Sequence, residues 1–399
     1  MSAIIFEDER WADFRPISST RHMAQQVLGS RSVAEQVGSR LEGEMVLWGR
    51  DYLARTAKEA TGLSYNERPD GAVLAINARI NPLVDFEGMV GGRSEFALLD
   101  RGEVAMAILR SKDFERSASE HGTLIQRKLS ASSRRLERIE AAEPVLFSYP
   151  WELLGANEGA LEGKAKGRGA ARLSISPDAD VEEFVAFEPL AGAITIAAGA
   201  RIESFSRISG PCYVGPRAVV KSALVRGGTS IGEDCRIGGE VDHSIVYPHT
   251  NKSHHGYLGH SIVGEWVNIG AGATTSDLKN TYGTVKVQRG SRRVDSGLQK
   301  LGAMVGDMAK LSIGTMVHCG RSLGVGAHCS GLVDRDVPDF VSYQGGSREP
   351  FRLSLQSVVQ TQERMMKRRQ GELSRSRKLL IENLYGNASE GGDEARKRP

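Results

Sequence analysis

The stretch IAAGARIESFSRISGPCYVGPRAVV, residues 196–220, carries the repeat that decides the fold. A branched apolar residue returns at every sixth position, and the same spacing resumes further along the chain. The positions that keep it are Ile196, Ile202, Ile208, Val214, Val220, Ile231, Ile237, Val263, Ile269, Val305, Leu311, Val317 and Leu323. This period excludes a coiled coil and is typical of short flat strands with a tight corner after each. It predicts a parallel β-helix in which three such strands make one triangular coil.

Two interruptions of the repeat, at residues 243–256 and 276–302, mark where a binding site is expected. In a β-helix the branched residue points inward and stacks on its equivalents, while a small residue beside it lets the corner close. Insertions leave this stack and gather on one face, which is often the face that binds a ligand.

Length and composition narrow the class of protein. The 399 residues, 40% of them hydrophobic, are enough for at least two domains. The net charge of +3 argues against a nucleic-acid partner, and no apolar run approaches the roughly 18 residues that a membrane helix needs. The four cysteines lack a C-x-x-C spacing and the start shows no signal peptide, so we expect a cytoplasmic protein without a membrane partner.

The chain before the repeat predicts an α/β domain over residues 1–162, with a mostly parallel sheet. Short apolar runs alternate there with helix-like stretches at residues 32–41 and 51–61. The apolar runs are AIIF, EMVLW, AVLAI, EFALL and VAMAIL. Residues 111–142 are polar and rich in helix formers, which favours one or two solvated helices.

Composition divides the remainder of the chain into four segments. Residues 163–173 are small and basic, as in a linker, and residues 174–345 hold the β-helix. Residues 346–385 predict a helical segment that caps the β-helix or packs on a neighbouring subunit, because open β-helix ends need covering. The residues expected on its packing face are Leu355, Val358, Val359, Gln362, Met365 and Met366. Residues 386–399 are polar and predict a disordered tail.

Four motifs in the β-helix resemble those of a known family. They are NKSHHGYLG (251–259), EWVNIGAG (265–272), LKNTYGTVKV (278–287) and GLQKLGAMVGD (297–307). Together they resemble the bifunctional N-acetylglucosamine-1-phosphate uridylyltransferase/glucosamine-1-phosphate N-acetyltransferase family, and more narrowly a sugar nucleotidyltransferase subfamily with a C-terminal hexapeptide-repeat domain. The resemblance implies a left-handed β-helix, an exception to the right-handed crossover rule. It also implies a homotrimer with active sites between subunits.

The resemblance assigns roles to residues of the first interruption. His254 matches the catalytic histidine, and a neutral imidazole suits the base that takes a proton from an attacking amine. Tyr257 and Asn268 match residues that contact the sugar phosphate and orient the histidine. Lys252 offers a positive charge to the phosphate. The alternative is that these are solvent-exposed corner residues.

Two further sites are considered in the β-helix. Thr315 and Ser330 match positions near the acyl-CoA groove, with acetyl-CoA as the acyl donor. A metal site is the weaker alternative for the remaining histidines, because their spacing is irregular and no cysteine accompanies them. These histidines are His243, His249, His255 and His260.

The N-terminal domain resembles sugar-1-phosphate nucleotidylyltransferases less completely. FRPISSTR, residues 14–21, is similar to the segment after their phosphate-binding loop, but EDERWAD before it lacks the glycines that let backbone N–H groups approach a triphosphate. In VLAINAR, Arg79 stands where the family has the aspartate that holds Mg²⁺, and an arginine could instead bind a phosphate. In PWELLGANEGAL, Glu152 or Asn157 could assist a metal. The candidate nucleotide contacts are Arg15, Thr20, Arg21 and Arg79.

Three functions remain open at this point. The first is acyl transfer from acyl-CoA to an amino-sugar phosphate, with His254 as the base. The second is Mg²⁺-dependent nucleotidylyl transfer from a nucleoside triphosphate to a sugar or cyclitol phosphate, with the β-helix serving assembly. The third is a non-enzymatic scaffold in which both sites have decayed. Loss of glycine and aspartate in the first domain favours the first function over the second.

Overall fold

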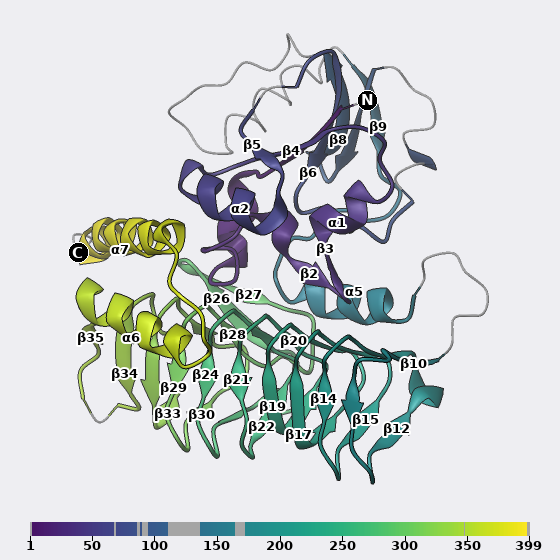
Figure 1. The fold of residues 1–399 in the computed structure, drawn as a ribbon. Coiled ribbons are helices and arrows are strands. Elements are labelled where there is room, and N and C mark those ends of the chain that lie inside the picture. The colour runs from purple at the N-terminus through teal and green to yellow at the C-terminus, as the bar shows by residue number, and fades with distance from the viewer. Residues whose placement is uncertain are drawn as a thin grey trace. The chain divides into compact units, whose positions relative to one another are not determined.

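The computed structural model describes residues 2–67, 69–85, 88–89, 95–110, 136–163, 172–346 and 348–396, which form two compact units (Figure 1). The N-terminal unit comprises Met1–Phe14, Thr20–Gln26 and Arg31–Tyr149. The β-helix unit comprises Arg15–Ser19, Val27–Ser30 and Pro150–Pro399. Of the polar segment 111–142, for which helices were predicted, residues 111–135 lie outside the described residues and Glu137–Glu140 form a strand instead. Most of the expected linker, residues 164–171, also lies outside the described residues.

The N-terminal unit is built on a seven-stranded sheet with the order β5-β4-β1-β6-β8-β7-β9. Its strands are β1 (Ser2–Phe6), β4 (Met45–Trp48), β5 (Ser64–Tyr65), β6 (Ala72–Asn77), β7 (Phe96–Asp100), β8 (Glu103–Arg110) and β9 (Glu137–Glu140). Helices α1 (Val33–Gly38) and α2 (Ala54–Thr61) lie within the two predicted helical stretches. The Ser32 side chain caps α1 by accepting a hydrogen bond from the Glu35 backbone N–H. The predicted α/β class is confirmed.

Strand β8 makes the sheet mixed, which the sequence pattern did not predict. It runs antiparallel to both β6 and β7, whereas the other neighbours in the sheet are parallel. Arg101 and Gly102 join β7 to β8 with φ of 53° and 80°. Two successive residues with positive φ make the tight turn that favours a hairpin. The alternation of apolar runs therefore concealed one hairpin among the parallel strands.

The β-helix unit has three faces, each a row of parallel strands (Figure 1). The first face consists of β10 (Leu173–Ile175), β13 (Ile194–Ile196), β16 (Cys212–Val214), β18 (Thr229–Ile231), β20 (Ile245–Val246), β23 (Ile262–Val263), β28 (Met304–Val305) and β31 (Ser322–Leu323). The second consists of β11 (Asp180–Val181), β14 (Arg201–Ile202), the first parts of β17 (Val219–Val225) and β19 (Arg236–Asp242), β21 (Asn251–Lys252), β24 (Asn268–Ile269), β29 (Lys310–Leu311), β32 (His328–Ser330) and β34 (Val341–Gln344), which β35 (Phe351–Arg352) extends antiparallel. The third consists of β12 (Ala186–Glu188), β15 (Arg207–Ser209), the second parts of β17 and β19, β22 (Tyr257–Gly259), β25 (Thr274–Thr275), β30 (Met316–Val317) and β33 (Leu332–Val333). This arrangement confirms the predicted parallel β-helix.

The core of this unit is the stack that the six-residue spacing predicted. On the first face Ile196 pairs with Val214 and Val214 with Ile231, so equivalent branched residues lie one above another. All of them are buried in one continuous hydrophobic cluster. The first interruption stays inside the β-helix, with Lys252 at an inward position that pairs with Ile237. The second leaves the stack and contains a hairpin, β26 (Lys286–Arg289) and β27 (Arg292–Asp295).

Three helices complete the unit, namely α5 (Glu152–Leu161), α6 (Leu355–Lys367) and α7 (Arg375–Arg396). Helix α6 buries four residues of the face that the sequence predicted: Val358, Val359, Gln362 and Met366. Helix α7 packs on α6 and continues to Arg396, so the backbone is helical over most of the segment predicted as a disordered tail. Among the described residues, no helix combines the length and apolarity needed to cross a membrane.

Candidate active site

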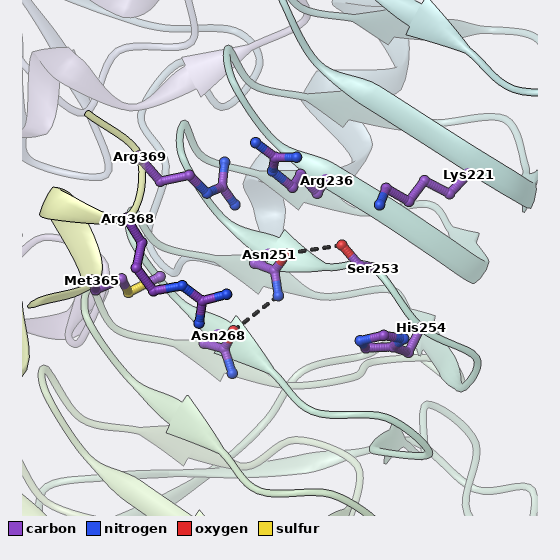
Figure 2. Close-up of a pocket in the computed structure, with 9 residues that line it drawn as sticks. All are labelled: Lys221, Arg236, Asn251, Ser253, His254, Asn268, Met365, Arg368 and Arg369. Atoms are coloured by element: carbon purple, nitrogen blue, oxygen red, sulfur yellow. Dashed lines mark hydrogen bonds between the residues drawn. The ribbon is translucent and has the colours of Figure 1, made fainter. Parts of the chain in front are cut away.

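A pocket of about 430 Å³ opens on the second face of the β-helix, beside the end of α6 (Figure 2). Its lining residues are Lys221, Arg236, Asn251, Ser253, His254, Asn268, Met365, Arg368 and Arg369. They come from β17, β19, β21, β24 and the C-terminal end of α6, so the pocket gathers residues nearly 150 positions apart in the chain. His254 and Asn268, which the family resemblance pairs, lie in it together.

The register of the coils places the amides of this pocket. Arg236 pairs with Asn251, and Asn251 with Asn268, so the three project from one face on successive coils. The Asn251 amide donates to Asn268 Oδ1 at 2.9 Å, and the Ser253 hydroxyl donates to Asn251 Oδ1 at 2.9 Å. This chain of hydrogen bonds, drawn in Figure 2, holds Asn268 with its amide nitrogen available to a ligand.

The pocket is strongly cationic. Lys221, Arg236, Arg368 and Arg369 line it, and no carboxylate is among the lining residues. Burial and the neighbouring charge of Arg236 lower the pKa of the Arg369 guanidinium. Asp234, which does not line the pocket, offsets part of this at Arg369, whose Nη1 also donates to the Asp234 carbonyl oxygen at 2.9 Å. Like charges gathered in a hollow whose lining has no carboxylate are stabilised by an anion, and guanidinium groups suit phosphate oxygens. The arrangement therefore fits a phosphorylated ligand.

Sequence reasoning missed the two arginines, Arg368 and Arg369, that directly follow α6. They belong to the run MKRRQ, residues 366–370, which begins at the last buried residue of the helix, Met366. A basic run at the end of a helix is the signal that could have found them. Its place beside His254 depends on how the C-terminal segment folds back on the β-helix, which no local pattern reports.

His254 occupies the corner that follows β21, and its side chain is exposed at one edge of the pocket (Figure 2). No described side chain or backbone group hydrogen-bonds to its ring. An exposed imidazole beside a polar pocket can accept a proton from a bound amine. The predicted position of His254 in a site is thus supported by geometry.

Lys252 does not face the pocket, which corrects its expected contact with a phosphate. It is 2% exposed, and its ammonium donates to the carbonyl oxygens of Gly238 (2.7 Å), Gly256 (2.7 Å) and His254 (3.3 Å). Burial lowers the pKa of this ammonium to about 8. The inward position of Lys252 in the strand decides this outcome, because alternate residues of a strand point to opposite faces.

Tyr257 lies on the third face, away from the pocket of His254. Its hydroxyl donates to Asp277 Oδ2 at 2.7 Å, and burial together with that carboxylate raises its pKa above the usual range. It lines a separate hollow with Arg207 and Glu240. Within the described chain, Tyr257 therefore does not share a pocket with His254, contrary to the expected common role.

The two expected acyl-CoA residues differ in exposure. Thr315 is fully buried, and its hydroxyl donates to the carbonyls of Ser312 (2.8 Å) and Cys329 (3.3 Å). This corrects its assignment to a groove, because a residue that satisfies the backbone inside the coil cannot reach a ligand. Ser330 ends β32 and is half-buried, and its assignment stays a prediction.

Three of the four histidines considered for a metal contact other partners, and the fourth, His255, is exposed at the corner beside His254. His243 and His260 stack with ring centroids 5.0 Å apart, and their Nδ1 atoms lie 2.8 Å from Asp242 and 2.7 Å from Asp277. His249 stacks on Trp266. Over the described ranges, no group of three or more metal-ligating side chains comes together.

In the N-terminal unit, the structure contradicts the phosphate-binding role expected of Arg79. Its guanidinium is 1% exposed and bonds to Asp8 at 2.6 Å and Glu103 at 2.7 Å. An arginine at the place of the metal-binding aspartate neutralises the carboxylates that a Mg²⁺ ion would need. These residues do not fit the ion. Asn157, in the β-helix unit, is not available to a metal either, because its amide hydrogen-bonds to the backbone of Gly29 and Gly228.

The segment that replaces the glycine-rich loop is held by a second buried ion pair. Glu7 and Arg50 lie 2.7 Å apart with both side chains fully buried. Burial alone would raise the pKa of Glu7, but the Arg50 charge holds it well below the usual range. Thr20 and Arg21 are 8% and 5% exposed, and the Arg21 carbonyl accepts a hydrogen bond from Arg50. Arg15 is exposed and belongs to the β-helix unit.

The fold and site define a two-domain chain in which a nucleotidyltransferase-type α/β unit is joined to a hexapeptide-repeat β-helix. Residues 3–168 match the family described as sugar nucleotidyl transferase, which confirms the resemblance of the N-terminal half. The bifunctional protein GlmU of Methanocaldococcus jannaschii is 36% identical over 121 residues, 29% of this chain and 29% of that protein. The bifunctional sugar-1-phosphate nucleotidylyltransferase/acetyltransferase of Sulfurisphaera tokodaii is 29% identical over 192 residues, 47% of this chain and 45% of that protein.

The chain thus spans less than half the length of these curated relatives. Among solved structures, the polySia-specific acetyltransferase NeuO is similar at 13% identity and a TM-score of 0.26, over 45% of this chain and 86% of that one. A likeness at this level says nothing about the reaction.

Proposed function

We propose that the β-helix unit transfers an acyl group from acyl-CoA to the amine of an amino-sugar phosphate. The observation that carries the proposal is the pocket, in which His254 stands beside four cationic side chains and no carboxylate. The Sulfurisphaera tokodaii relative, named as a bifunctional sugar-1-phosphate nucleotidylyltransferase/acetyltransferase, supports the same class of chemistry.

His254 acts as the general base in this reaction. The amine nitrogen attacks the thioester carbonyl carbon, and the imidazole takes the proton that the nitrogen loses as the C–N bond forms. The C–S bond then breaks, and the proton held by His254 passes to the departing thiolate, so that the products are the amide and free CoA thiol. A positioned base contributes about 100- to 10,000-fold to such a step.

The cationic side chains bind phosphate. Arg236 projects from the same row as Asn251 and Asn268, while Arg368 and Arg369 approach from α6. Both proposed substrates carry phosphate, and the fork of a guanidinium holds its oxygens in a fixed geometry. The amide of Asn268 supplies a neutral donor or acceptor close to the sugar.

The assembly that goes with this function is a homotrimer. Large apolar side chains stand exposed on the β-helix, among them Phe184, Phe205 and Ile313. Phe184 and Phe205 stack on each other with ring centroids 5.9 Å apart. Exposed apolar groups of this size are typical of surfaces that pack on another chain. Light scattering of the purified protein measures the subunit number directly.

A second candidate is nucleotidylyl transfer by the N-terminal unit, favoured by the match of residues 3–168. The bonds that commit Arg79 to Asp8 and Glu103 weigh against it. Pyrophosphate release from a nucleoside triphosphate and a sugar 1-phosphate tests this candidate. If neither this reaction nor acyl transfer is detected, the remaining interpretation is a non-enzymatic scaffold.

The test of the main proposal is thiol release from acetyl-CoA with glucosamine 1-phosphate. We expect release by the wild type and a loss of 100-fold or more in His254→Ala, with unfolding unchanged within about 0.5 kcal/mol because the residue is exposed. His255→Ala is the matched control, since His255 is exposed at the same corner and does not line the pocket. Equal loss in both variants, or full turnover in His254→Ala, would remove His254 from the mechanism.

A further inference from the structure

A buried lysine interrupts the hydrophobic stack directly beneath the corner of His254. Lys252 pairs in register with Ile237, so it takes a place where neighbouring coils carry a branched apolar residue. Its aliphatic stem fills that place, and its ammonium reaches the corner between the second and third faces. A charge is rarely buried unless specific polar groups surround it.

The groups around this ammonium are three backbone carbonyls. Two of them, those of His254 and Gly256, belong to the corner that carries the imidazole, at 3.3 Å and 2.7 Å. The third, that of Gly238 at 2.7 Å, belongs to the equivalent corner of the preceding coil. An ammonium has three N–H donors, so each carbonyl can be satisfied by one of them.

The two corners are stacked too closely for ordinary side chains. A Cβ atom placed on Gly238 would lie 2.3 Å from the Ser253 carbonyl oxygen. Buried carbonyls need donors, and the ammonium supplies one to each of the three, while the Gly256 carbonyl also accepts a hydrogen bond from the Glu240 N–H at 3.1 Å. An apolar residue at position 252 would leave them without the ammonium.

We propose that Lys252 is the positioning residue for His254: its ammonium ties the corner at residues 254–256 to the preceding coil and so fixes where the imidazole stands in the pocket. The inference rests on the proposed role of His254 as the base. Lys252 itself touches no ligand, because its ammonium is covered by the corner it holds.

The test compares Lys252→Met with Lys310→Met. Methionine keeps most of the length of the lysine stem and removes the donors. Lys310 is the matched control, because it is also largely buried and its ammonium donates only to backbone carbonyls, those of Trp266 (3.0 Å) and Met308 (2.7 Å), in a different corner.

Two measurements are made on each variant of the full chain. In the thiol-release assay we expect Lys252→Met to lower kcat on the order of 100-fold, with KM for both substrates nearly unchanged, because a base displaced by about 1 Å loses alignment while binding is kept. By hydrogen exchange and mass spectrometry we expect faster exchange over residues 253–258. In Lys310→Met we expect neither change.

The outcomes separate this inference from the proposed function. Wild-type kcat and wild-type exchange at the corner in a folded Lys252→Met protein would overturn the inference. A wild type without thiol release would overturn the role of the base, and the exchange comparison would still decide whether Lys252 holds the corner. If Lys252→Met does not fold, Lys252→Ile takes its place, because it removes the donors and places there the residue type that Ile237 supplies on the neighbouring coil, and normal exchange with normal kcat in that variant also overturns the inference.

Discussion

The buried arginines of the N-terminal unit and the arginines of the β-helix pocket are chemically the same group in opposite situations. Arg50 and Arg79 are paired with Glu7 and with Asp8 inside the protein, at 2.7 Å and 2.6 Å. Arg236, Arg368 and Arg369 line a pocket to which no carboxylate contributes. A cation matched within the chain stabilises the fold, whereas cations that crowd a hollow unmatched are available to a ligand.

This comparison explains why the two halves of the molecule are assigned different roles. In the N-terminal unit, the segment that would carry a phosphate-binding loop instead supplies Glu7 and Asp8 to buried ion pairs. In the β-helix unit, the unmatched charge lies next to an exposed imidazole. Residues 3–168 match the sugar nucleotidyl transferase family model, but the buried charges of this unit are paired with one another within the fold.

The largest expected effect comes from removing one partner of a buried ion pair, which tests whether the paired cations stabilise the fold. Arg50→Met leaves Glu7 buried without a counter-charge, and we expect it to lower the free energy of unfolding by about 3–5 kcal/mol, measured by urea denaturation. Lys58→Met is the control, because the Lys58–Glu67 pair is exposed and its loss should change little. Equal stability of the two variants would mean that the buried pair is not structural.

Lys252 is a buried cation that bonds to carbonyls rather than to a carboxylate, so the pH dependence of stability should distinguish it from the buried arginine–carboxylate pairs. Because the pKa of Lys252 is lowered from 10.5 to about 8, the unfolded chain binds a proton there that the folded chain does not. Between pH of about 8 and 10.5, the free energy of unfolding of the wild type should therefore rise with pH, relative to that of Lys252→Met, by up to about 3 kcal/mol. Urea denaturation at several pH values measures the difference. Parallel curves for the two proteins would show that this lysine is not desolvated.

The smallest expected effect concerns the unmatched arginines. We expect the double substitution Arg368→Ala and Arg369→Ala to raise KM for the phosphorylated substrates about tenfold, equivalent to about 1.4 kcal/mol, and to weaken the salt dependence of KM. Stability should fall by no more than about 1 kcal/mol, since the one hydrogen bond lost is that from Arg369 Nη1 to the Asp234 carbonyl oxygen at 2.9 Å. Arg364→Ala, on an exposed part of α6 that does not line the pocket, is the control. An unchanged KM would place the anion elsewhere.

Much of the fold could be predicted because its signals are local and periodic. Val214 and Ile231 stack as expected, since a residue that recurs at fixed spacing must recur on the same side of the coil. The β7–β8 hairpin was not predicted, because Arg101 adopts a positive φ that its residue type rarely signals. The sequence likewise predicted the buried face of α6 from its apolar spacing.

Part of the candidate site could likewise be predicted from the sequence, and part could not. His254 and Asn268 could be predicted from motifs, since both lie close together in the chain and on adjacent coils. Tyr257 was assigned to the same site by the family resemblance, and Lys252 by the positive charge that it could offer to a phosphate. The pleat of the strand turned Lys252 inward, and the corner carried Tyr257 to another face.

The sequence by itself determined that the chain forms a β-helix after an α/β unit, and that His254 stands at a corner of it, because periodic apolar spacing and corner chemistry act over a few residues. Only the tertiary structure decided which charges are matched. The ion pair of Arg79 with Asp8 and the position of Arg368 in the pocket both depend on how segments far apart in the chain come together. The electrostatic energy of these groups depends on distance in space and on burial, which local sequence patterns do not report.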